Sequence, residues 1–105
     1  MIMEHNFQNG TLTVFLPVRI DSANAADTEA KLLDLVEDYE PNAVVMDAKD
    51  MQYICSAGLR IILNVKKKVS DTEVINASSV VYDIFKTTGF NIVLNITKVH
   101  RNRSK

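Results

Sequence analysis

The sequence has little of what metal sites, disulfide scaffolds or phosphate-binding loops require. It holds one cysteine in 105 residues, so no disulfide can form within the chain. Its two histidines, His5 and His100, stand far apart, and no ligand spacing of the zinc type occurs. The three glycines are also widely separated, which excludes a glycine-rich phosphate loop. We therefore expect neither a structural metal nor a bound cofactor.

Long apolar runs are missing as well. No segment approaches the roughly 20 apolar residues that span a bilayer. The first residues, MIMEHN, lack the basic start and the apolar stretch of a signal peptide. Together with the single thiol, these absences predict a cytoplasmic protein without membrane insertion.

Patterns that indicate catalysis or nucleic-acid binding are sparse. Neither histidine lies near a candidate nucleophile, and the acidic residues of the first predicted helix lie on its outward face. We therefore expect no enzymatic activity. No aromatic residues interleave with the basic residues that follow position 98, so direct nucleic-acid binding is not expected either.

Charge is unevenly distributed, although the formal net charge is only −1. Residues 1–50 carry 10 acidic and 3 basic side chains, whereas residues 51–105 carry 3 acidic and 9 basic ones. Two interpretations are open: opposed charged faces that steer a partner, or solvated surfaces of different helices. The basic residues 98–105 are predicted to form a frayed tail.

The first half of the chain predicts a hairpin, a helix and a buried strand. Asn9-Gly10 lies between two strand-like segments, and both residues tolerate the positive φ of a tight hairpin turn. A helix is expected to about Tyr39, opened by Asp21 or Ser22 as its cap, with Tyr39 at the end of its buried stripe. The run at 43–46 is continuously apolar, which favours a strand that is covered on both faces.

The second half continues the alternation of strands and helices. A helix is predicted at about 57–69, with Leu63 on its buried side and Val65 on its flank. A strand at 73–77, a helix that ends at Gly89 and a last strand or irregular edge at 92–96 follow. This order predicts a single α/β domain over residues 1–105. We expect a mixed sheet with the hairpin strand at one edge, parallel strands inside and helices packed against it.

The turn before the second helix reads YICSAGLR over residues 53–60 and places Ser56 at the predicted helix start. One interpretation is structural, because a serine at this position can cap a helix. The other is a switch, because a phosphate at a helix N-terminus meets unpaired amides, and the small residues Ala57 and Gly58 leave the hydroxyl accessible. Both interpretations stay open from the residues alone.

Several segments together resemble the STAS family, named for sulfate transporters and anti-sigma factor antagonists. They are Val18–Ala25, Ala43–Asp47 and Tyr53–Leu59, with Thr88-Gly89-Phe90 after the third helix. The resemblance covers nearly the whole chain and agrees with the order of elements predicted above.

The resemblance implies an anti-sigma factor antagonist of the stand-alone type. Such a protein binds an anti-sigma factor that is also a serine kinase, is switched off when the kinase phosphorylates a serine, and is restored by a serine/threonine phosphatase. Aligned on its small-residue turn, this sequence puts Ser56 at the phosphoacceptor position. The residues expected to bind the partner are Asp21, Ser22, Ile54, Cys55, Ala57, Gly58, Leu59 and Arg60.

The sequence departs from the family pattern at one position. The family usually has Asp before the phosphoacceptor serine, where this chain has Cys55. Two alternatives follow: a constitutive STAS-like accessory subunit of a membrane transport complex, or a thiol sensor, since a helix N-terminus favours thiolate. Cysteine is also a common small buried residue, which explains Cys55 without any function.

Overall fold

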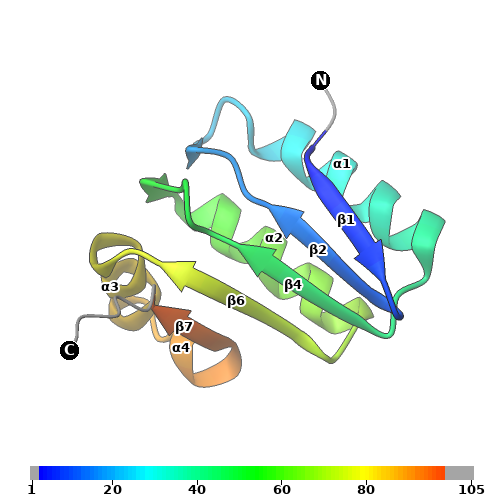
Figure 1. Cartoon of the computed structure of the whole chain (residues 1–105). Coiled ribbons are helices and arrows are strands. Elements are labelled where there is room, and N and C mark those ends of the chain that lie inside the picture. The colour runs from blue at the N-terminus through cyan, green and yellow to red at the C-terminus, as the bar shows by residue number, and fades with distance from the viewer. Residues whose placement is uncertain (1–2, 99–105) are drawn as a thin grey trace.

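Five strands form the central sheet, in the order β1-β2-β4-β6-β7, and a second sheet contains only β3 and β5 (Figure 1). This computed structural model describes residues 3–98. The predicted basic tail begins inside β7, at Lys98, and its other residues lie outside the described range. The strands are β1 His5–Gln8, β2 Thr11–Phe15, β3 Arg19–Ile20, β4 Ala43–Asp47, β5 Tyr53–Ile54, β6 Thr72–Ala77 and β7 Asn95–Lys98. The helices are α1 Ala25–Tyr39, α2 Ser56–Lys68, α3 Ser79–Thr87 and α4 Phe90–Val93.

The predicted α/β architecture with a mixed sheet is confirmed. Strand β1 pairs antiparallel with β2 at one edge, whereas β2, β4, β6 and β7 run parallel to one another. The turn between β1 and β2 has the expected geometry, because φ is 55° at Asn9 and 82° at Gly10. These left-handed conformations match the twist of a two-residue hairpin.

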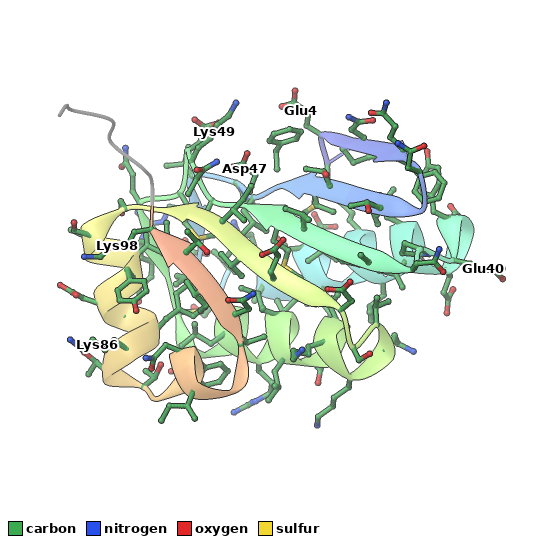
Figure 2. All side chains as sticks on the ribbon, turned by 60° about the horizontal axis from the view of Figure 1, so that its bottom comes forward. Glu4, Glu40, Asp47, Lys49, Lys86 and Lys98 are labelled. Atoms are coloured by element: carbon green, nitrogen blue, oxygen red, sulfur yellow. The ribbon has the colours of Figure 1, made fainter. Side chains whose placement is uncertain are left out.

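The core lies between the central sheet and the helices. Val44 and Met46 of β4 are fully buried, and Val45 between them is only half-buried. Figure 2 shows the described helices beneath the sheet and none above it. The predicted cover on both faces of this strand was therefore wrong, because all helices of residues 3–98 pack on one side.

Helix α1 begins at Ala25 rather than at Asp21 or Ser22. Its last residue, Tyr39, was predicted to be buried and is instead 38% exposed. The Tyr39 ring stacks on the Phe7 ring of β1, with 4.8 Å between the ring centroids. The helix therefore ends beside the edge strand and not over the centre of the sheet.

Two further predictions are corrected in the second half of the chain. On α2 the side chain of Val65 is fully buried and that of Leu63 half-buried, so the buried stripe includes the residue placed on the flank. The run at 92–96 is not one strand. Gly89, with φ of 81°, precedes the short helix α4, and β7 begins only at Asn95.

The two-stranded sheet of β3 and β5 was not predicted, and it leads directly to the Ser56 turn. The strands pair in parallel, with Arg19 opposite Tyr53 and Ile20 opposite Ile54. The amide of Cys55 then donates to the carbonyl of Ile20 at 2.9 Å. The chain segments that follow β3 and β5 therefore leave at the same end.

Gly58 allows α2 to lie close to this small sheet. A Cβ atom on Gly58 would stand 2.6 Å from Ile54 Cγ1 and 2.9 Å from Ile20 Cγ2. Both isoleucines are buried, with at most 2% of their surface exposed. The first turn of α2 is thus packed directly onto β3 and β5.

We predict that Gly58→Ala lowers the free energy of unfolding by about 1–3 kcal/mol, because the added methyl overpacks this contact. Chemical denaturation measures the change. The control is Ala30→Leu on the exposed side of α1, which is expected to change stability by no more than about 0.5 kcal/mol. A Gly58→Ala variant as stable as the parent protein would contradict this account of the packing.

Candidate functional site

The loop between β3 and α1 is closed by its own side chains. Asp21 Oδ1 accepts hydrogen bonds from the amides of Ala23 at 3.0 Å and Asn24 at 3.2 Å. Asn24 Oδ1 accepts from the Asp21 amide at 2.9 Å, and Asn24 Nδ2 donates to the Arg19 carbonyl at 3.0 Å. Asp21 therefore stabilises the loop before the helix, and the prediction that it caps α1 was wrong.

The electrostatics of this loop favour the ionised form of Asp21. The Asn24 amide beside it lowers the pKa of Asp21, burial raises it, and the Ala23 amide and Arg19 lower it further, with a net shift below the ordinary value. Arg19 Nε lies 3.0 Å from Asp21 Oδ2. The Arg19 guanidinium also stands over the Tyr53 ring of β5, 5.3 Å from its centroid.

Ser56 is exposed and is the first residue of α2. The capping position belongs to Cys55, whose φ of −90° and ψ of 176° are extended. Cys55 makes no side-chain cap hydrogen bond, and Ser56 lies inside the helix, so the interpretation of Ser56 as a helix cap was wrong. The amides at the start of a helix carry a partial positive charge, and no side chain within residues 3–98 accepts a hydrogen bond from them here.

Helix α3 shows the contrasting arrangement. It also begins with an exposed serine, Ser79, but the preceding Ser78 accepts a hydrogen bond from the Val81 amide at 3.2 Å. Ser56 and Ser79 therefore occupy the same position in their helices, but of these two helices α3 has a side-chain cap and α2 does not.

A groove of about 330 Å³ separates α1 from α2 beside this turn. Asn64 Nδ2 of α2 donates to Glu29 Oε2 of α1 at 3.0 Å within it. We call it the α1–α2 groove. It is lined by Ser22, Ala25, Ala26, Glu29, Ala57, Arg60, Ile61 and Asn64.

The STAS domain sequence model matches residues 3–103 of the chain. The chain belongs to the STAS domain family. In sequence it is similar to the candidate anti-sigma factor antagonist BtrV of Bordetella bronchiseptica, with 34% identity over 86 residues, covering 78% of this chain and 73% of BtrV.

Solved structures of low sequence identity share the STAS fold. One is an anti-sigma factor antagonist from Mycobacterium paratuberculosis, with a TM-score of 0.81 and 20% identity, covering 90% of this chain and 83% of that one. Another is the Bacillus protein SpoIIAA. Its unphosphorylated form gives a TM-score of 0.74 at 14% identity, covering 90% and 86% of the two chains. Its phosphorylated form gives 0.65 at 13%, covering 90% and 89%.

The STAS fold brings part of the predicted partner-binding set to one surface. Ser22, Ala57 and Arg60 line the α1–α2 groove. Ser56 is exposed at the N-terminus of α2. The remaining positions divide into half-buried and buried ones. Asp21 and Cys55 are half-buried, whereas Ile54, Gly58 and Leu59 are buried and support the surface from beneath.

Other groups of this STAS surface were not predicted. Glu29 and Asn64 are 35 residues apart, so no local pattern marks their contact. The Arg19–Tyr53 contact depends on the pairing of β3 with β5, which was also not predicted.

Within residues 3–98, no group of three or more His, Cys, Asp or Glu side chains is placed to hold a metal ion. No helix in that range combines the length and hydropathy needed to cross a bilayer.

We predict that the Asp21 carboxyl titrates with a midpoint below its ordinary value of 3.8. Because the folded-state pKa is lower than the unfolded one, Asp21 stabilises the protein above the unfolded pKa, and this contribution is lost as the pH falls through the folded pKa. Carboxyl-carbon NMR against pH measures the midpoint. Arg19→Gln should raise it, and a parent midpoint at or above 3.8 would count against the closed loop.

A second prediction concerns the missing cap. Cys55→Asp should raise the free energy of unfolding by about 0.5–2 kcal/mol near neutral pH, because a carboxylate at this position accepts from the first-turn amides. Chemical denaturation measures the gain against Cys55→Ala, which adds no acceptor. Ser56→Ala should change stability by no more than about 0.5 kcal/mol, because Ser56 is not the cap. Equal stabilities for Cys55→Asp and Cys55→Ala would refute the missing-cap account.

Proposed function

We propose that this STAS domain is an anti-sigma factor antagonist, a non-enzymatic regulatory protein that binds an anti-sigma factor through the Ser56 end of α2. The partner is also a serine kinase, and phosphorylation of Ser56 ends the binding. One observation carries the proposal: an exposed serine stands first in α2, where no side chain of the described residues caps the helix amides. The STAS match and the relatives named as antagonists support it.

The chemistry of the turn suits a reversible phosphate. A phosphoserine adds about −1.5 to −2 charges and three strong acceptor oxygens. At the start of α2 these oxygens meet unpaired amides, so the fold tolerates the modification. SpoIIAA, which shares the fold, has been solved in phosphorylated and unphosphorylated forms.

The same charge disrupts a binding surface. A partner surface fitted to a neutral hydroxyl and small side chains would have to desolvate the new charge on association. Ala57 and Ser22 provide little bulk beside Ser56, and Arg60 and Glu29 give the groove polar ends. A serine/threonine phosphatase that removes the phosphate would restore the neutral surface and the binding.

The proposal predicts phosphorylation at a single serine. The protein is incubated with ATP and an anti-sigma factor serine kinase from the same organism, and the phosphate is located by mass spectrometry. We expect modification of Ser56 and none after Ser56→Ala. Ser79→Ala is the matched control, because Ser79 is also an exposed first residue of a helix, and its loss should leave the modification unchanged. An active kinase that leaves Ser56 unmodified would rule out the switch.

The accessory-subunit alternative is separated by binding measurements. Ser56→Asp places a negative charge at the start of α2 and should abolish binding to the anti-sigma factor if Ser56 is the switch. In a constitutive subunit that contacts its complex elsewhere, the same change would leave assembly intact. The thiol-sensor interpretation of Cys55 stays a prediction, and the rate of Cys55 alkylation against pH tests it.

A further inference from the structure

The outer side of β1 is an edge without the usual protection. No strand of residues 3–98 pairs with that side, because β1 ends the sheet order. Its four residues, HNFQ, include no Lys, Arg, Asp, Glu or Pro. Proteins commonly place charges or proline on edge strands to prevent pairing with another chain. Among the described residues, the outward backbone donors and acceptors of this edge therefore pair with no other strand.

An aromatic surface lies on the helix side of this edge. His5 pairs with Val14 and Phe7 with Leu12. Val14 and Leu12 are buried between the sheet and the helices, so His5 and Phe7 point to the helix side. Tyr39 of α1 stacks on Phe7, and its Oη lies 3.3 Å from His5 Nε2. Phe7 and Tyr39 are each 38% exposed, so an added strand would cover them.

An acidic stripe on α1, formed by Asp27, Asp34 and Asp38, lies on the side of the helix that faces the same edge. Asp27 and Lys31 line a hollow together with Met3, which directly precedes the β1 region, so this side of α1 faces the edge. Asp34 and Asp38 continue the stripe three and seven residues beyond Lys31, and both are exposed. Lys31 is engaged by Asp27 at 2.6 Å. Figure 1 shows α1 running alongside β1 at this side of the sheet.

A strand that fits this edge is extended and basic on one face. Residues 99–105 of the chain read VHRNRSK. Arg101, Arg103 and Lys105 alternate in this segment, and alternate residues of an extended strand project from one face. In a strand added to β1, that face can lie next to Asp34 and Asp38 of α1.

The segment cannot reach the edge of its own molecule. It follows β7, which lies at the opposite edge of the sheet from β1. Reaching the outer side of β1 means crossing five strand spacings of about 4.8 Å, or about 24 Å. Seven fully extended residues span about 24 Å at most, which leaves none to pair with β1. A second copy can supply the segment without this crossing.

We propose that the outer edge of β1 binds residues 99–105 of a second copy as an added strand, with the basic face of that strand beneath Asp34 and Asp38. The contact joins different surfaces of the two copies, so association proceeds head to tail. It uses none of the residues of the Ser56 turn or the α1–α2 groove, and it does not depend on the proposed function.

Sedimentation velocity on the full chain tests this association. The weight-average mass should rise with protein concentration at low ionic strength and fall towards the monomer at high salt, because exposed charge pairs are screened. A mass that stays at the monomer value at every concentration and salt level would overturn the proposal.

Two complementary variants make the test specific. Arg101→Ser/Arg103→Ser/Lys105→Ser removes the basic face and keeps the β1 edge, whereas Asp34→Lys/Asp38→Lys reverses the acidic stripe and keeps the basic segment. Each alone should stay monomeric. Mixed in equal amounts, they should form a 1:1 complex that does not grow further, since only one intact edge meets one intact segment. A mixture that remains monomeric would contradict the proposal.

Asp71→Lys/Asp83→Lys is the matched charge control. Both aspartates are exposed and lie before β6 and on α3, so the net charge changes equally at a different place. This variant should still associate with itself. If it becomes monomeric as Asp34→Lys/Asp38→Lys does, net charge and not the β1 edge governs association, and the proposal fails. Thermal unfolding confirms that each variant is folded, and the triple variant alters no residue of the described elements.

Discussion

The parallel pairing of β3 with β5 is the constraint on which the candidate site depends. Each strand has only two residues, yet the pairing continues through the hydrogen bond from the Cys55 amide to the Ile20 carbonyl. That bond places the end of the Asp21 loop beside the start of α2. Without it, the two segments are separated by 30 or more residues of chain, and nothing local would bring Ser22 and Ala57 to one groove.

Much of the fold could be predicted because its elements have their own periodic or turn signals. Asn9-Gly10 marks the hairpin, and the alternation of strands and helices indicates a parallel sheet. A two-residue strand such as β3 has no period to detect, so it was missed. The run at 43–46 was wrongly predicted to be covered on both faces. Its half-buried Ala and Val are apolar, although no helix of residues 3–98 covers the face of the sheet that they share.

At the candidate site, the sequence predicted where residues lie better than it predicted what their side chains do. Ser56 was correctly placed at a helix start, yet the residue in the capping position is Cys55. Aspartate is a residue type that commonly caps helices, but Asp21 closes the loop before α1 instead. Its carboxylate accepts hydrogen bonds from two backbone amides before the helix begins. The contact of Glu29 with Asn64 arises only from helix packing, which a single sequence does not encode locally.

The close contact of Gly58 with two buried isoleucines has a further meaning for recognition. A flexible segment that becomes ordered on binding loses conformational entropy at that moment, which weakens association. The first turn of α2 has already lost this freedom on folding, because it rests on Ile20 and Ile54 without an intervening side chain. A partner therefore meets a preformed surface, and its affinity is not reduced by the need to order this turn.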